Sequence, residues 1–397
     1  MKFFLLSALN LFVMGSTFVF FSTSIRISVP TVAANFIIFG LAQNASSLFS
    51  DSGKTNLAFR QTLKNPAQKK GIYSNLVHER LKMNLPIHFI ALVVFTLKGI
   101  GFLEWIVFIL ISTTVVLYSI GLSMVQADES YLRVYSMQCL NAFGFITASY
   151  LLSRISEPSL LTILVHLFCA WIPVLIYFSK SILNLFVNAP RYSETAKDKE
   201  YFSGILYANF VTLNYNSFLL SLYSPNLLIS YTASSMPVAL LMPISSTLST
   251  LTSHRFKQQS FEITRKQIFK ALYLMPVFVI LGTISAPLLT IVLGKIFGSD
   301  YVFFNIVVIQ LYSAILGLFT GLFGNLFSAA FLSRFNRIIA IAQTIVVLTI
   351  GTLGSMFHSI LIVAFADLTA RAVGLVLAAR ISLRYGKGNF HASPSND

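Results

Sequence analysis

Residues 360–380 read ILIVAFADLTARAVGLVLAAR, an apolar segment with Asp367 and Arg371 in its middle. About 20 mostly apolar residues are enough for a helix to cross a lipid bilayer. Charged side chains are costly inside such a helix, so those that occur there usually face a protein interior or a polar cavity. The segment therefore predicts a membrane-spanning helix whose two charges are candidates for function.

The composition of the whole chain points the same way. Of the 397 residues, 56% are hydrophobic and only 10% are charged, whereas a soluble domain carries about 25% charged residues. A soluble fold of this size would lack the polar side chains needed to cover its surface. The formal net charge of +15 does not call for a nucleic-acid partner, because in a membrane protein the basic residues first report topology.

Apolar segments of spanning length recur along the chain. They predict an all-α polytopic membrane protein with about twelve transmembrane helices. The expected spans are 3–22, 29–49, 84–103, 105–125, 134–153, 159–179, 202–222, 227–252, 271–294, 302–330, 338–356 and 360–380.

Lys and Arg residues are distributed very unevenly over the connections between these spans. The connections on one side, together with both termini, carry 23 of the 28 Lys and Arg residues. The other side carries four, namely Arg26, Lys98, Arg154 and Lys295, and Arg371 lies within the last span. Basic residues concentrate on the cytoplasmic side of membrane proteins, so both termini are predicted to be cytoplasmic.

Two of the basic connections are long. The connection at 180–201 leaves six spans on each side, which predicts an N-terminal six-helix lobe (1–190) and a C-terminal six-helix lobe with a short cytoplasmic tail (191–397). The connection at 50–83 is expected to form short interfacial helices, interrupted at Pro66 and Gly71.

Asp367 and Arg371 stand four residues apart, which places them on one face of a helix. Two interpretations are open. The residues form an ion pair that holds two helices together, or they line a polar cavity in which Arg371 meets an anion and Asp367 titrates or couples transport to an ion.

Other polar residues of the spans also have two explanations. Arg26 and Lys98 lie at outer helix ends, where long basic side chains extend to the lipid headgroups, or where they would contact an anionic substrate. Asn209 and Asn216 are seven residues apart and share a helix face. Hydrogen bonds between helices explain such amides as well as substrate contact does.

Catalytic motifs are missing from the sequence. It has no H-E-x-x-H pair for a metal and no G-x-x-x-x-G-K-[ST] loop for a nucleotide. The two cysteines, Cys139 and Cys169, both lie in apolar segments and are interpreted as packing residues. We therefore expect no enzyme activity, no metal site and no cofactor.

Three short stretches resemble motifs of one membrane-protein family. Residues 47–53 (SLFSDSG), with Asp51 and Gly53, resemble the end of its second helix. Residues 228–234 (LISYTAS), with Tyr231, resemble the opening of its eighth helix. The turn with Gly298 and Tyr301 resembles the one before its tenth helix. The family is that of the O-antigen and capsular polysaccharide repeat-unit flippases, within the multidrug/oligosaccharidyl-lipid/polysaccharide exporter (MOP) superfamily.

The resemblance implies a MATE-like, V-shaped pair of six-helix lobes in the bacterial inner membrane. Such a protein flips an undecaprenyl-diphosphate-linked oligosaccharide from the inner to the outer leaflet by ion-coupled alternating access. Its implied partners are the lipid-linked substrate, membrane lipids, a polysaccharide polymerase and a chain-length regulator, with no nucleic acid. Arg26 and Arg371 would meet the diphosphate or an acidic sugar, because Arg suits bidentate phosphate contact.

Two other function classes compete with a flippase. A membrane-embedded glycan polymerase or ligase would be expected to have a large outward loop with catalytic Arg or His, and every outward turn predicted here is short. A cation-coupled small-molecule exporter of the same superfamily would be expected to have acidic residues in the spans of the N-terminal lobe, and the sequence has none there.

Overall fold

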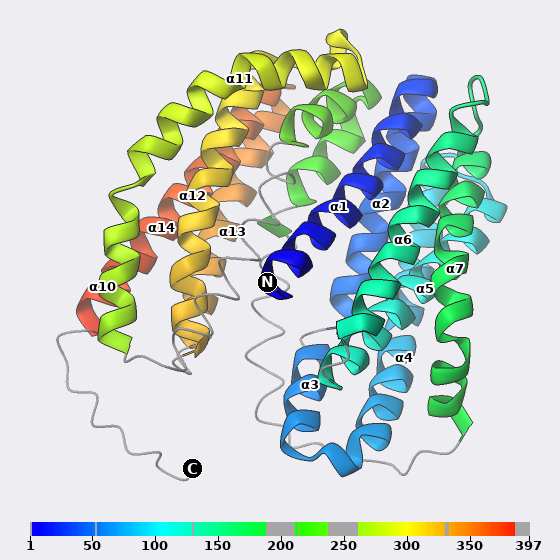
Figure 1. Cartoon of the computed structure of the whole chain (residues 1–397). Coiled ribbons are helices and arrows are strands. Elements are labelled where there is room, and N and C mark those ends of the chain that lie inside the picture. The colour runs from blue at the N-terminus through cyan, green and yellow to red at the C-terminus, as the bar shows by residue number, and fades with distance from the viewer. Residues whose placement is uncertain are drawn as a thin grey trace. The chain divides into compact units, whose positions relative to one another are not determined.

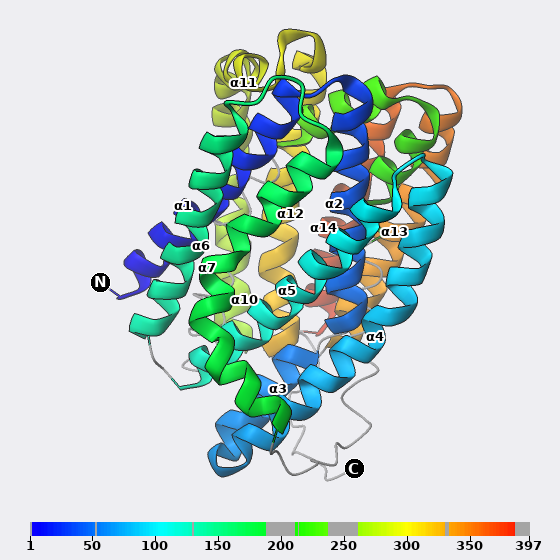
Figure 2. The ribbon, with the colours of Figure 1, turned by 90° about the vertical axis from the view of Figure 1, so that its right-hand side faces the viewer.

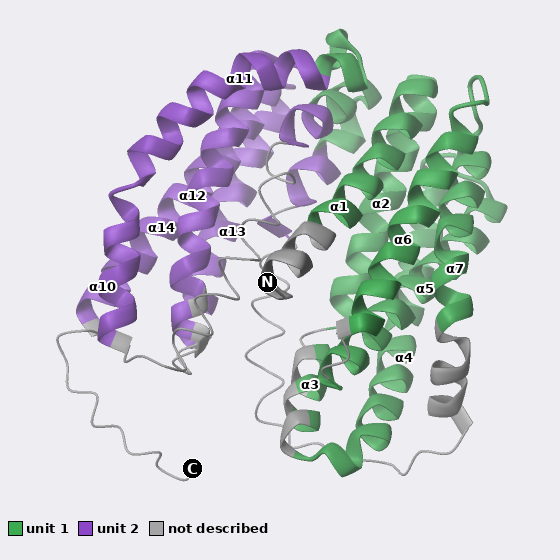
Figure 3. Ribbon diagram, viewed as in Figure 1, with its two compact units in different colours: residues 1–210, 220–230, 294–301 green, residues 211–219, 231–293, 302–397 purple. Residues whose placement is uncertain are grey.

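The computed structural model describes residues 2–51, 54–128, 131–187, 211–212, 214–236, 261–329 and 333–385. Helices make up nearly all of this part of the chain (Figure 1). Two compact units contain them (Figure 3). Unit 1 comprises residues 1–210, 220–230 and 294–301, and unit 2 comprises residues 211–219, 231–293 and 302–397. The predicted lobe boundary at 190 lies outside the described residues.

Unit 1 is built mainly from the first part of the chain. Its helices are α1 (Lys2–Ile27), α2 (Pro30–Asp51), α3 (Lys54–Lys64), η1 (Pro66–Gln68), α4 (Lys69–Leu97), α5 (Phe102–Ala127), α6 (Tyr131–Leu152) and α7 (Leu160–Val187). Helix α6 packs against both α1 and α7 (Figure 2). At the α6–α7 contact, a Cβ on Gly144 would lie 2.1 Å from the carbonyl oxygen of Ala170, so only glycine allows this approach.

The apolar core of unit 1 includes a cluster of aromatic rings. Phe39 of α2, Phe95 of α4 and Phe108 of α5 are fully buried. Their ring centroids lie 5.3 to 6.2 Å apart, which is the usual spacing of favourable aromatic pairs. The cluster holds α2, α4 and α5 together.

Unit 2 is built mainly from the last part of the chain. It contains α10 (Phe261–Leu272), α12 (Phe304–Ala329), α13 (Ser333–Met356), α14 (Ile360–Tyr385) and most of α11 (Met275–Phe297). Residues 214–223 and 225–236 are also helical. Residues 214–219 and 231–236 of these helices belong to unit 2, and the residues between them belong to unit 1. Helix α14 packs closely against α12 and α13, where Gly354 and Gly374 remove side chains from the α13–α14 contact.

The helices confirm the predicted all-α fold class. Within the described residues, eight helices are long and apolar enough to cross a membrane. Several expected spans match a helix closely, such as 105–125 with α5 and 360–380 with α14.

The expectation for residues 50–83 was wrong in one respect. A break was predicted at Gly71, with the next span starting at 84, but α4 runs unbroken from Lys69 to Leu97. Gly71 is buried within it. A glycine costs a helix only about 1 kcal/mol, and the partners of the first turns of α4, described below, outweigh that cost.

Candidate functional site

Asp367 lies within α14, and its carboxylate is the centre of a polar cluster in unit 2. Three neutral side chains donate hydrogen bonds to it. Asn216 Nδ2 lies 2.7 Å from Oδ1 and Gln310 Nε2 lies 2.9 Å from Oδ2, and the Tyr231 hydroxyl also donates to Oδ2. Hydrogen bonds to a charged group are stronger than neutral ones, at about 1.5–3 kcal/mol each. The cluster thereby stabilises a charge that would otherwise be costly in a membrane span.

Each donor comes from a different helix. Asn216 belongs to helix 214–223, Tyr231 to helix 225–236 and Gln310 to α12. Their hydrogen bonds with Asp367 join segments that are 151, 136 and 57 residues away in the sequence. One carboxylate therefore connects four helices.

Arg371 lies one helical turn after Asp367. Its side chain passes over Gly317 of α12, where an added Cβ would lie 3.6 Å from both Cδ and Nε of Arg371. The guanidinium interacts electrostatically with Asp367. Within the described residues, however, Arg371 forms no salt bridge of 4.0 Å or less and no hydrogen bond. Asp367 is held by neutral donors, and no described residue accepts a hydrogen bond from Arg371.

The amide of Asn216 has a second, unused group. Asn216 is 1% exposed, and its Oδ1 is buried without a hydrogen-bond partner. A Cβ on Gly351 of α13 would lie 2.2 Å from this oxygen, so the position requires glycine. The oxygens of Asp367, Asn216 and Tyr231 are hard ligands of the kind that bind small cations, and the same carboxylate is able to take up a proton.

The other residues singled out in the sequence do not join this cluster. Arg26 is exposed in the last turn of α1, where a cation interacts favourably with the helix dipole. Lys98 follows α4, and its Nζ donates to the carbonyl oxygen of Ser221 at 2.5 Å. Asn209 and Gly53 lie outside the described residues. The structure brings together Asn216, Tyr231 and Asp367, with Arg371 beside them.

The Gly298–Tyr301 stretch forms a turn after α11. Gly298 has a φ of +106°, a conformation that side chains disfavour. The Gly298 N–H donates to the Gly294 carbonyl at 2.9 Å, and the Tyr301 N–H donates to the Gly298 carbonyl at 3.2 Å. The geometry explains the glycine as a helix terminator.

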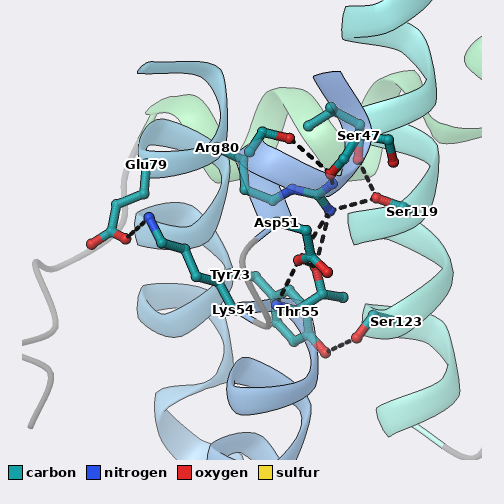
Figure 4. A network of polar contacts seen from close by, with 11 residues as sticks. Ser47, Asp51, Lys54, Thr55, Tyr73, Glu79, Arg80, Ser119 and Ser123 are labelled. Carbon is teal, nitrogen blue, oxygen red and sulfur yellow. Dashed lines mark hydrogen bonds and ion pairs between the residues drawn. The ribbon is translucent and has the colours of Figure 1, made fainter. Parts of the chain in front are cut away.

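A second polar network surrounds Asp51 in unit 1 (Figure 4). Asp51 ends α2, and its Oδ1 accepts hydrogen bonds from the backbone N–H of Thr55 at 3.0 Å and from the Thr55 hydroxyl at 2.5 Å. The backbone bond caps the start of α3. Asp51 therefore fixes the corner between α2 and α3.

Arg80 of α4 is the central residue of this second network, and the sequence reading missed it. It is 1% exposed and lies 3.6 Å from Asp51. Its Nη1 donates to Ser119 at 2.6 Å and to Thr55 at 2.9 Å, and its Nη2 donates to the Ser47 carbonyl at 3.2 Å. In the sequence, Arg80 was interpreted only as one of the basic residues of the connection at 50–83.

Replacing Thr55 by Val tests the Asp51 corner. The variant keeps the shape of the side chain but removes one donor to Asp51 and one acceptor from Arg80. We expect the free energy of unfolding to fall by about 1–3 kcal/mol, the cost of leaving buried polar groups unpaired. Denaturant titration of the purified protein measures this change. Thr96→Val is the matched control, because Thr96 is exposed and bonds only to its own helix; an equal loss there would contradict the assignment.

Comparisons with known proteins give a fold but no family. No protein-family model matches the sequence, and no curated protein matches it significantly. Among solved structures, a MATE transporter in complex with MaL6 superposes with a TM-score of 0.64 at 12% identity, covering 98% of this chain and 97% of that one. A MOP superfamily transporter from Pyrococcus furiosus gives 0.62 at 10% identity, with 98% and 96% covered. An outward-facing multidrug resistance MATE family transporter gives 0.63 at 10% identity, with 98% and 97% covered. Over nearly its full length, this multi-pass membrane protein has the fold of the MATE transporters of the MOP superfamily.

Proposed function

We propose that this protein is an ion-coupled transporter that moves an anionic lipid-linked oligosaccharide from the inner to the outer leaflet of a bacterial inner membrane. The observation that carries the proposal is the state of Arg371. Its guanidinium lies within a membrane span and, among the described residues, has no hydrogen bond or salt bridge. Arg binds phosphate groups in a bidentate manner, so a diphosphate is a fitting partner.

Asp367 supplies the coupling in this proposal. Tyr231 and Gln310 both donate to Oδ2, so a proton on that oxygen replaces an acceptor by a donor and breaks at least one of these bonds. A cation bound to the carboxylate would compete with the same donors. Because the donors come from separate helices, a change at Asp367 alters the packing of those helices. Alternating access by one part of the protein moving against another is the expected mode of transport.

The cellular setting of the proposal follows from the charge distribution and the motifs. Both termini would be cytoplasmic, and the Lys and Arg residues there would contact anionic headgroups. A polysaccharide polymerase and a chain-length regulator are the proteins expected to act on the product.

A second candidate is a small-molecule exporter with the same fold. The names of two solved structures with this fold support it: one is a multidrug resistance MATE family transporter, and another is a MATE in complex with Br-NRF. This candidate shares the coupling site and differs only in what meets Arg371.

Deleting the gene and following lipid-linked glycans separates the candidates. A flippase predicts complete repeat units trapped on the cytoplasmic leaflet, with recovery when the wild-type gene is restored. A polymerase defect would leave single units delivered and attached, and loss of a small-molecule exporter would change neither pool. Either of these last two results would overturn the proposed substrate.

Replacing Arg371 by Lys tests the anion contact in the same cells. Lys keeps the charge but loses the planar pair of donors. The loss of about one charge-assisted hydrogen bond, about 1.4 kcal/mol, would slow flipping about tenfold. Arg380→Lys is the control, because Arg380 is exposed on the same helix. A flipping rate unchanged by Arg371→Lys would remove Arg371 from the substrate site.

A further inference from the structure

One face of α4 carries a row of buried polar side chains that the transport proposal does not use. The row has spacings of seven, four and four residues, which place its members on the same side of the helix. Each member bonds to a hydroxyl of α2 or α5. The pairs are Tyr73 with Ser123 at 3.0 Å, Arg80 with Ser119 at 2.6 Å, Asn84 with Ser46 at 2.8 Å and His88 with Ser112 at 2.7 Å.

His88 differs from the rest of the row because only imidazole changes its charge near neutral pH. It is 6% exposed. The Ser112 hydroxyl that meets its Nε2 also donates to the carbonyl of Ile109 at 3.1 Å. With the hydroxyl proton directed to Ile109, Nε2 carries a hydrogen that Ser112 accepts. A second proton must then enter at Nδ1, for which the described residues provide no acceptor.

The surroundings of the His88 ring are apolar. Phe108, which is fully buried, lies with its ring nearly perpendicular to the imidazole, and the ring centroids are 5.6 Å apart. The indole N–H of Trp105 donates to the backbone carbonyl of His88 at 2.8 Å. These contacts hold α4 against α5 at the level of the ring, and neither brings an anionic group to the imidazole.

The charged and titratable side chains with described contacts on the helices packed against α4 have partners other than His88. Asp51 of α2 bonds to Thr55, Asp128 after α5 pairs with Lys69, and Lys54 of α3 pairs with Glu79 of α4 itself. The Glu104 carboxylate of α5 lies beside Gly101, at the start of its own helix. His166 of α7 bonds to the Thr162 carbonyl at 2.8 Å. Within the described residues, no charged group interacts electrostatically with His88.

We propose that His88 is a proton-operated switch of the contact between α4 and α5. Uptake of a proton at Nδ1 places an unpaired charge in an aromatic site, where an unpaired charge is strongly unfavourable. A conformation in which the imidazole reaches water or headgroups binds the proton more readily, so acid favours that conformation. The contact is closed above the usual titration range of histidine and loosens as the pH falls through and below it. The switch belongs to unit 1 and is separate from the coupling proposed at Asp367.

Hydrogen exchange measured by mass spectrometry on the full chain in lipid nanodiscs tests the switch. Exchange is compared at pH 8 and pH 5, after correction for the intrinsic pH dependence of exchange. Peptides within 84–116 of the wild-type protein are expected to exchange about tenfold faster at pH 5, which corresponds to about 1.4 kcal/mol. Peptides from α13 are expected to show no such increase between pH 8 and pH 5, which is called the step below. His88→Gln keeps a hydrogen-bond donor but never gains a charge, so it is expected to remove the step.

His166→Gln serves as the control, since His166 is a partly buried histidine bonded within its own helix. This variant is expected to keep the full response. Three results would overturn the switch: no step in the wild type, a step spread evenly over both units, or a full step that persists in His88→Gln. The location of the step in the wild type decides the matter even if the His88 variant folds poorly.

Discussion

Asp367→Asn is expected to lower the rate of ion-driven transport about 100-fold, while the protein still folds and reaches the membrane. Asn has the shape of Asp but neither takes up a proton nor carries a charge. Tyr231 and Gln310 both donate to Oδ2 of Asp367, and an amide nitrogen in that place faces two donors. The loss of two charge-assisted hydrogen bonds, at about 1.5 kcal/mol each, corresponds to about a 100-fold fall in the coupled rate.

Transport driven by an imposed proton or cation gradient measures this effect in vesicles made from cells that express the variant. Tyr231→Phe keeps the carboxylate and removes one donor, so it is expected to lower the rate only about tenfold. Asp300→Asn is the matched control, because Asp300 is exposed in η3 (Ser299–Tyr301). A rate in Asp367→Asn close to that of the wild type would exclude this carboxylate as the coupling group.

The spans were predictable from the sequence because long apolar segments end at clear signals. Gly101 precedes α5 and Asp128 follows it, and the apolar residues between them specify the helix without help from the rest of the chain. Such segments need only their own length and hydropathy to be recognised. The fold class follows from their number.

The polar half of α4 was not predictable in this way. Lys69, Glu79 and Arg80 look like residues of a solvated connection. They pair instead with Asp128 after α5, Lys54 of α3 and Asp51 of α2. A helix stabilised by partners far away in the sequence has no apolar signal of its own. The spacing of Arg80, Asn84 and His88 at every fourth residue was the signal that the sequence did contain.

The site was predictable only in parts. A carboxylate within an apolar segment identified Asp367, an amide identified Asn216, and a motif identified Tyr231. Their meeting depends on tertiary packing across 136 and 151 residues, which no local pattern encodes. Gln310 was missed as a candidate site residue, although it is an amide within an apolar segment, as Asn216 is.

Arg80→Met is expected to produce the largest loss of stability. The guanidinium is 1% exposed and bonds to groups on α2, α3 and α5. Met fills a similar volume but leaves Asp51 without its cation and three oxygens without their donor. Removing one partner of a fully buried charge pair costs about 3–5 kcal/mol, and we expect the lower end of this range because the Asp51 side chain is 25% exposed. Denaturant titration in detergent measures the change, and Lys82→Met, at an exposed position two residues later, is expected to stay within about 0.5 kcal/mol of the wild type.

A double-mutant cycle separates the ion pair from simple loss of packing. Asp51→Ala in the wild-type protein leaves a buried guanidinium without its carboxylate, whereas the same change in the Arg80→Met background removes a carboxylate that no longer has a partner. The second step is therefore expected to cost less than the first, by about 0.5–3 kcal/mol. Equal costs in the two backgrounds would mean that the 3.6 Å approach of Asp51 and Arg80 contributes no coupling, and that Arg80 holds unit 1 together only through Thr55, Ser119 and the Ser47 carbonyl.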